Sequence, residues 1–75
     1  MIRLSELKPG QTGLIEAIEQ NDLGLKLMEM GFMVGERVTY LKKAPMGDPI
    51  SVKIGNYLLS LRADEAVAVF VNLSV

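Results

Sequence analysis

The side chains in this sequence that could do chemistry are carboxylates, guanidinium groups and methionine thioethers. The chain has no cysteine and no histidine, so it lacks the commonest transition-metal ligands and the usual general base near neutral pH. The carboxylates occur as Glu16 with Glu19 and as Asp64 with Glu65, and neither pair has further ligands beside it in the sequence. We therefore expect no catalytic residue, no metal site and no bound cofactor, and the sequence does not indicate an enzyme.

Arg62, which shortly precedes two carboxylates, allows two interpretations. A guanidinium can reach into a nucleotide-hydrolysis site and stabilise the transition state. The other interpretation is a local ion pair or loop hydrogen bond that holds the closing part of the fold. The sequence favours the local role, because nothing else near Arg62 resembles a nucleotide site.

Composition limits the class of protein. The 75 residues are enough for one domain, residues 1–75, and 49% of them are apolar, which suits one small core. Eight basic residues face nine acidic ones, and Lys42–Lys43 is the adjacent basic pair, so nucleic acid is not an expected partner. The longest apolar run, residues 66–71, is far shorter than the roughly 20 residues of a membrane-spanning helix. No secretory signal is recognised, so we expect a cytoplasmic protein that meets a membrane only through a partner.

Alternation of apolar and polar residues indicates short strands separated by tight turns. We expect strands over residues 13–19, 36–43, 50–54, 57–61 and 66–73, with a single helical turn at residues 63–65. Ile18 interrupts the first alternation, which indicates a bulge near that strand's end. Gly55-Asn56 is typical of a two-residue hairpin turn. The pattern predicts a mainly β fold, a small barrel of about five strands, because closure hides sheet edges.

One short helix is expected after the first long strand. Asn21 and Asp22 carry side-chain oxygens that can cap free backbone amides. The apolar residues of one helical face follow as Leu23, Leu27 and Met30. Gly31 occupies the position just after the helix, where a residue in the left-handed conformation commonly ends it. Gly24, inside the helix, weakens it by about 1 kcal/mol relative to alanine. Packing must therefore hold the helix in place.

Four blocks of residues, in this order and spacing, resemble the FeoA family. They are Leu27-Met28-Glu29-Met30-Gly31-Phe32, then Gly35 with Val38, then Ala44-Pro45-Met46-Gly47-Asp48-Pro49-Ile50, and finally Leu61-Arg62 with Glu65-Ala66. The resemblance covers residues 4–71, and its mild departures are Met46, where leucine is common, and Met33.

FeoA proteins are small cytosolic accessory proteins of bacterial ferrous-iron transport. The resemblance implies an SH3-like barrel and a protein partner, the cytosolic region of FeoB, which is a membrane ferrous-iron permease with a GTP-binding domain. The same fold occurs in iron-dependent repressors. A regulatory module that binds such a repressor, or another protein, is therefore the alternative function.

Most residues in these blocks have a structural explanation. Glycines can supply a helix cap and a turn before a strand, and prolines fix the geometry of a loop. The residues assigned to such roles are Gly31, Gly35, Pro45, Gly47, Asp48, Pro49 and Arg62.

The candidate partner-binding residues are apolar residues that the core does not require. They lie off the core face of the helix, after the helix, at the tip of the proline-rich turn and on the outer face of the fourth expected strand. These residues are Leu25, Met28, Phe32, Met33, Met46 and Leu58. In that strand, Tyr57, Leu59 and Leu61 are expected to face inward. Exposed apolar residues and sheet edges also favour self-association at high concentration.

Overall fold

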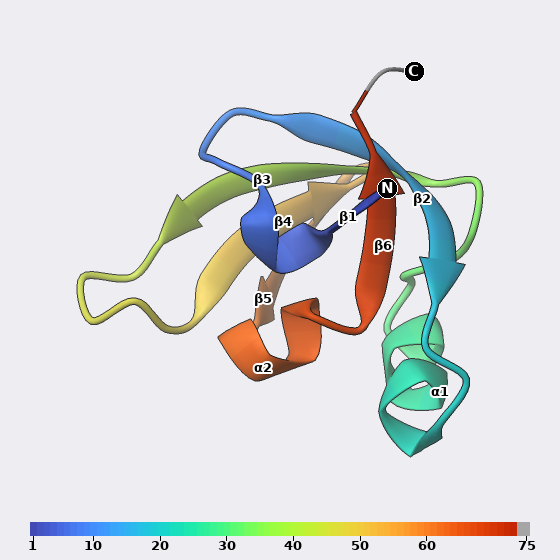
Figure 1. Ribbon diagram of the computed structural model, residues 1–75. Coiled ribbons are helices and arrows are strands. Elements are labelled where there is room, and N and C mark those ends of the chain that lie inside the picture. Colours follow the sequence, from blue (N-terminus) through green and yellow to red (C-terminus); the bar gives the residue numbers. More distant parts are fainter. Residues whose placement is uncertain (74–75) are drawn as a thin grey trace.

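The computed structural model describes residues 1–73, which form a strongly curved sheet with its helices gathered at one end (Figure 1). The elements are β1 (Ile2–Arg3), the 3-10 turn η1 (Leu4–Glu6), β2 (Thr12–Ile18), α1 (Asp22–Glu29), β3 (Arg37–Lys43), β4 (Ile50–Ile54), β5 (Tyr57–Leu61), α2 (Ala63–Ala66) and β6 (Val69–Asn72). The predicted mainly β architecture, with a helix after the first long strand, is confirmed. The strand beyond the five expected is β1, which has only two residues.

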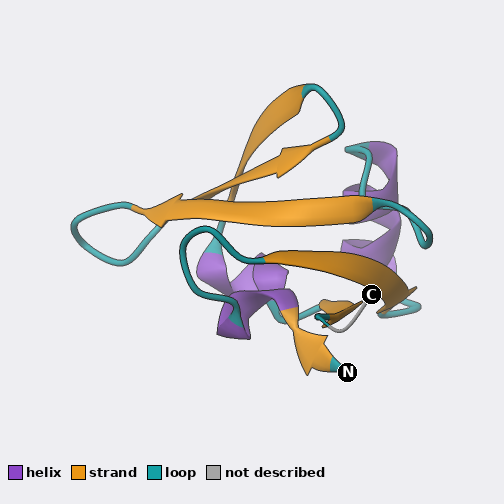
Figure 2. Cartoon of the chain, turned by 90° about the horizontal axis from the view of Figure 1, so that it is seen from above, coloured by secondary structure: helices purple, strands orange, loops and turns teal. Residues whose placement is uncertain are grey.

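The six strands form one sheet in the order β1-β6-β2-β3-β4-β5, and all neighbours are antiparallel. Register shifts occur in β2 between Ile15 and Ala17 and in β3 between Tyr40 and Lys42. Such bulges bend a strand and increase its twist, so they curl the sheet around its inner face (Figure 2). The bulge expected near Ile18 therefore lies earlier in the strand.

The core fills the inside of the curled sheet. Alternate residues of the strands point into it, and η1, α1 and α2 add one or two side chains each. Its largest fully buried members are Leu4, Ile15, Leu27, Phe32, Val38, Tyr40, Val52, Leu61, Val69 and Val71. This burial supplies the main stabilisation, since the apolar side chains leave water together.

The start of α1 is fixed by a cap and by a close backbone contact. The Asn21 side chain accepts a 2.9 Å hydrogen bond from the backbone N–H of Gly24, as its capping role predicts. A Cβ at Gly24 would stand 1.7 Å from the backbone oxygen of Glu19. Gly24 is therefore required for the helix to pack closely against the end of β2, and its cost in helix propensity is the smaller effect.

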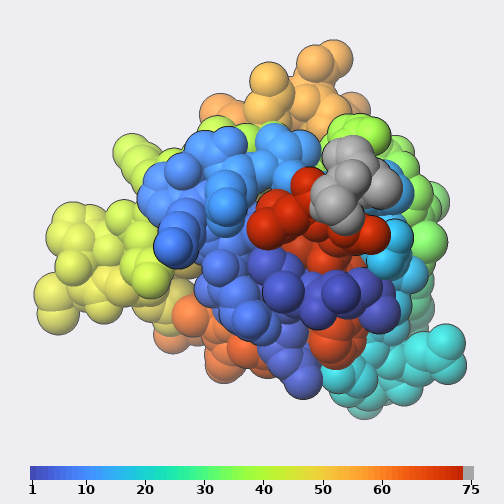
Figure 3. Space-filling model, turned by 45° about the horizontal axis from the view of Figure 1, so that its top comes forward, coloured from blue at the N-terminus to red at the C-terminus, as the bar shows by residue number. Residues whose placement is uncertain are grey.

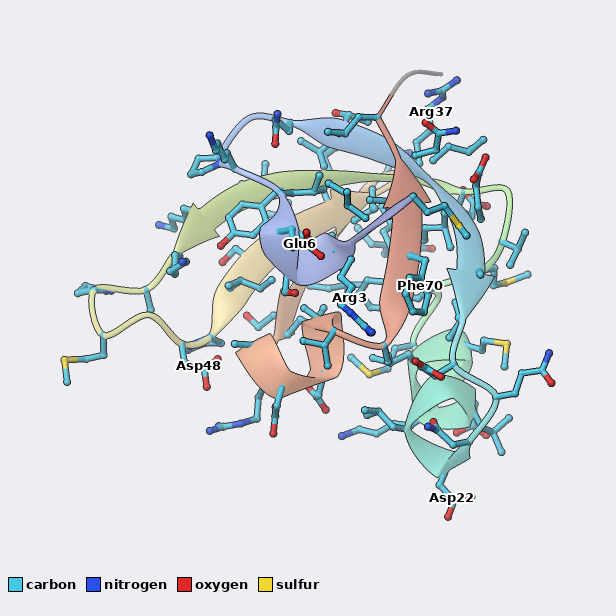
Figure 4. The ribbon with its side chains drawn as sticks, in the orientation of Figure 1. Arg3, Glu6, Asp22, Arg37, Asp48 and Phe70 are labelled. Carbon is cyan, nitrogen blue, oxygen red and sulfur yellow. The ribbon has the colours of Figure 1, made fainter. Side chains whose placement is uncertain are left out.

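Arg3 ties the short edge strand β1 to the body of the protein. Its guanidinium carbon lies 4.8 Å from the centre of the Phe70 ring, and one of its nitrogens donates to the Val67 carbonyl (Figure 4). The same nitrogen stands 3.8 Å from a carboxylate oxygen of Glu19. These contacts connect the start of the chain with β2 and β6.

Candidate protein interface

Four apolar side chains are exposed where α1 leads into β3. Leu25 is 55% exposed, Met28 41%, Met33 54% and Val34 63%. Leu25 and Met28 are three residues apart and so are neighbours on the outer face of α1, whereas Leu27 points into the core. We call these four residues the α1 surface. Val34 is not one of the predicted partner-binding residues. Its position between Met33 and Gly35, in the connection after the helix, is the sequence signal that points to its exposure.

Phe32 does not belong to this surface, because it is completely buried. Its N–H donates to the Leu27 carbonyl at 3.0 Å, and the N–H of Gly31 donates to the Met28 carbonyl at 3.1 Å. With φ of +111° at Gly31, this pair of bonds is the Schellman ending of a helix. It turns the chain back so that Phe32 packs in the core, where Leu27 is also buried. The prediction of Phe32 as a partner contact is therefore wrong.

The β3–β4 loop, residues 44–49, forms a second exposed feature at the other end of the molecule. It projects on the left in Figure 1, whereas α1 lies at the lower right, and Figure 2 preserves this separation. Met46 at its tip is 92% exposed. Hydrogen bonds from Ala44 N–H to the Pro49 carbonyl and from Gly47 N–H to the Ala44 carbonyl hold the loop, and Gly47 takes a φ of +90°. Met46 is thus presented on an ordered loop, apart from the α1 surface.

Asp48 fastens this loop to α2. One oxygen of its carboxylate accepts from the N–H of Ala63 at 2.8 Å, and the other lies 3.3 Å from a guanidinium nitrogen of Arg62. This is the local ion pair that the sequence favoured for Arg62. To reach into a partner, Arg62 would first have to leave Asp48.

The hairpin formed by β4 and β5 exposes two further apolar residues, Tyr57 and Leu58, which are 74% and 71% exposed. The exposure of Leu58 agrees with its expected outward position. Tyr57 was expected to be buried on the inward face with Leu59 and Leu61. That burial is wrong, because Tyr57 is exposed even though its partner in the sheet, Ile54, belongs to the core. Leu61, at the other end of β5, is buried as expected.

A charged contact joins the two helices and so orients the α1 surface. Lys26 of α1 places its ammonium 2.8 Å from a carboxylate oxygen of Glu65 in α2. The other oxygen of Glu65 accepts from the Arg62 N–H at 2.9 Å. The hydrogen bond from Lys26, followed by that from the Arg62 backbone, lowers the pKa of Glu65 below its ordinary value.

The described part of the chain offers surfaces more readily than a ligand site. Within residues 1–73 there is no group of three or more metal-ligating His, Cys, Asp or Glu side chains. No pocket is found within the same residues. A small-molecule site is normally concave, whereas a protein interface needs only a complementary partner.

Residues 2–73 match the family model for the FeoA domain. The chain belongs to the FeoA family. This family serves ferrous-iron transport as an accessory, and the match accounts for the motif blocks and their order.

Named relatives agree with this assignment. The Fe(2+) transport protein A/Fe(2+) transporter FeoB fusion protein of Porphyromonas gingivalis is 37% identical over 73 residues, which are 96% of this chain but only 9% of that protein. Iron(II) transport protein A of Clostridium thermocellum superposes with a TM-score of 0.88 and 39% identity, over 97% of this chain and 46% of that one.

A third relative settles the architecture. FeoA of Stenotrophomonas maltophilia, solved with zinc and described as a prokaryotic SH3 domain protein, has a TM-score of 0.83 and 31% identity, over 96% of this chain and 91% of that one. The predicted SH3-like fold of this FeoA chain is thus confirmed.

The fold extends beyond iron transport. A manganese-dependent transcriptional repressor superposes with a TM-score of 0.81 at 24% identity, over 92% of this chain and 39% of that one, which shows a shared fold alone.

In residues 1–73 of the FeoA chain, no helix is long and apolar enough to cross a membrane.

Proposed function

We propose that this FeoA protein is a cytoplasmic accessory of bacterial ferrous-iron uptake that binds the cytosolic region of the FeoB permease and modulates it. The observation that carries the proposal is the α1 surface, four exposed apolar side chains within ten residues of sequence. The fusion of FeoA and FeoB sequences in the P. gingivalis relative supports the choice of partner, because one chain keeps the two parts at high effective concentration.

The chemistry of the α1 surface suits docking on another protein. Isolated exposed apolar residues are common on monomers, but four of them on one helix and the connection that follows it stay in water at a cost that a partner removes. Met28 and Met33 have flexible thioether chains that adapt to the shape of a partner. Charged Lys26 and Glu29 on the same helix supply a polar rim, as in transient interfaces.

Binding alone is sufficient for this role. The domain needs no catalytic group, cofactor, metal or nucleic acid, and it approaches the membrane only through the permease. Gly24, packed against β2, and the Lys26–Glu65 ion pair hold α1 in place before a partner arrives. Such preorganisation reduces the entropy that is lost on association.

The alternative is a regulatory module that binds an iron-dependent repressor or another protein. The observation in its favour is the shared fold with the manganese-dependent repressor. A shared fold does not identify a binding partner. The fusion of FeoA and FeoB sequences in the P. gingivalis relative therefore makes the permease the better candidate.

The test is a titration of the isotope-labelled chain with the purified cytosolic region of FeoB, with and without a GTP analogue. Backbone amide shifts should change most for residues 25–34, and dependence on nucleotide would connect binding to the GTPase cycle. Shifts with a purified repressor and none with FeoB would support the alternative. Absence of shifts with FeoB at concentrations well above those of transient complexes would refute the proposed partner region.

A further inference from the structure

The strand β5 forms one edge of the sheet and is open on its outer side. Its one strand neighbour among residues 1–73 is β4. The β4–β5 hairpin rises at the top of the view in Figure 2, and residues near 55 project at the top of the space-filling view in Figure 3. Tyr57, Leu58 and Ser60 are exposed along this edge.

The register of the hairpin determines which backbone groups of β5 face outward. Gly55-Asn56 is a two-residue turn, in which the residues on either side, Ile54 and Tyr57, share hydrogen bonds. Bonded and non-bonded pairs alternate along antiparallel strands. Leu58 and Ser60 therefore direct their N–H and C=O groups away from β4, and no hydrogen bond joins these groups to another element within residues 1–73.

The features that usually protect an edge strand are absent from β5. Such edges carry charged side chains or proline, are interrupted by a bulge, or are very short. Residues 57–61 contain no charge and no proline, and β5 pairs with β4 without a register shift. The opposite edge, β1, is only two residues long and ends in Arg3, so it is protected.

We propose that β5 is a self-association site, at which a second copy of this chain pairs with it in antiparallel orientation about a two-fold axis at Leu59. In this register Leu58 lies opposite Ser60 of the second copy, and Ser60 lies opposite its Leu58. All outward N–H and C=O groups of both residues then find partners. Tyr57 of each copy comes opposite Leu61 of the other. Because the Leu61 side chain is already buried in its own core, the pairing rests on the backbone hydrogen bonds.

A second copy fits this edge because the strand complements itself. A two-fold axis at Leu58 or Ser60 would leave some outward N–H and C=O groups of β5 without partners. An axis at Tyr57 would leave more of these groups without partners. No charge within residues 57–61 opposes the approach of an identical strand, and the formal net charge of the chain is only −1. The contact is small beside a standard interface of roughly 1,600 Å², so the dimer forms at roughly 0.1–1 mM protein.

The test is an NMR dilution series of the full chain from roughly 2 mM to roughly 0.05 mM, the range in which such a weak dimer dissociates. The amide signals of Leu58 and Ser60 should shift most with concentration, and translational diffusion should slow as the protein becomes concentrated. A sample that mixes two labelling schemes should give an intermolecular contact between the Hα atoms of the two Leu59 residues. A chain that stays monomeric over the whole range would overturn the proposal.

Variants separate this edge from the α1 surface. Leu58→Lys and Ser60→Lys each place like charges across the two-fold axis and should weaken the dimer at least about tenfold, while Met33→Lys, the matched control, leaves it unchanged. Two lysine variants are used so that a loss of fold in one leaves the other informative. Self-association abolished by Met33→Lys but retained in both edge variants would overturn the proposal. Neither result depends on FeoB, so the proposed function is tested separately.

Discussion

The carboxylate of Asp48 accepts a 2.8 Å hydrogen bond from the backbone N–H of Ala63, fifteen residues further along the chain. Ala63 is the first residue of α2, where backbone amides have no partner within the helix. Asp48 thus caps α2 from a distance, and the same carboxylate pairs with Arg62. A residue in the proline-rich loop therefore stabilises the helix that leads into β6.

Replacing Asp48 should destabilise the protein. We expect Asp48→Ala to lower the free energy of unfolding by about 1–2 kcal/mol, because the Ala63 N–H and the Arg62 guanidinium both lose their partner. Asp48→Asn keeps an acceptor for Ala63 and should cost less. Urea denaturation of the three proteins measures the difference. Asp64→Ala, which removes an exposed carboxylate from the same helix, is the matched control, and an equal loss in both alanine variants would contradict the capping role.

The contact between Lys26 and Glu65 should make stability depend on pH. The pKa of Glu65 is lower in the fold than in the unfolded chain, first because of the hydrogen bond from Lys26. The ionised form therefore stabilises the fold fully above the ordinary glutamate value of 4.5 and loses this effect as the pH falls through the lowered value. Urea unfolding from pH 7 to pH 3 should show the loss.

The variant Glu65→Gln isolates this contribution. It should be less stable than the parent protein at pH 7, and the difference should shrink toward pH 3, where the parent carboxylate becomes protonated. Glu29→Gln removes an exposed carboxylate from α1 and serves as the control for the change in net charge. A Glu65→Gln difference that stays constant from pH 7 to pH 3 would disprove the linkage.

Gly24→Ala should destabilise the protein although alanine favours helices. The gain in propensity is about 1 kcal/mol, but the added methyl would overlap the Glu19 carbonyl at 1.7 Å and push α1 away from β2. We expect a net loss of about 2 kcal/mol or more in unfolding free energy. Leu25→Ala, at an exposed site in the next position, should change stability by less than about 0.5 kcal/mol. Thermal or urea unfolding of both variants decides the sign.

Local signals in the sequence predicted much of the fold. The hairpin at Gly55-Asn56, the cap at Asn21 and the turn at Gly31 each use a conformation or position that favours few other residue types. Phe32 is buried although its position after Gly31, in the connection to the next strand, favours exposure. The Schellman ending carries its own signal, an apolar residue two places beyond the helix that contacts the last turn, and Phe32 meets it.

Other features depend on the tertiary structure and could not be predicted from residue patterns. The requirement for glycine at position 24 arises from the approach of the Glu19 carbonyl, which becomes visible only when α1 lies against β2. Tyr57 follows the alternation of an inward residue and pairs with the buried Ile54, yet its own side chain is exposed. Likewise, residue patterns do not indicate that the β3–β4 loop, which carries Met46, projects at the end of the molecule away from α1 (Figure 1).

That separation yields a prediction about which end binds FeoB. Met28→Asp and Met33→Asp each place a charge within the α1 surface, where burial against a partner would strip it of water. We expect each variant to weaken binding to the cytosolic region of FeoB at least about tenfold, an effect typical of central interface residues. Met46→Asp makes the same change on the β3–β4 loop and should alter affinity by less than about threefold, since its site lies outside the contact.

The three aspartate variants also test whether these positions belong to the surface at all. All three methionines are exposed, so each variant should keep the unfolding free energy within about 0.5 kcal/mol of the parent. Isothermal titration calorimetry against FeoB, with urea unfolding on the same samples, separates lost contact from lost fold. If Met46→Asp alone abolished binding, the loop would be the docking element. In that case the Asp48–Ala63 bond, which holds the loop against α2, would orient the partner, and Asp48→Ala should weaken binding as well.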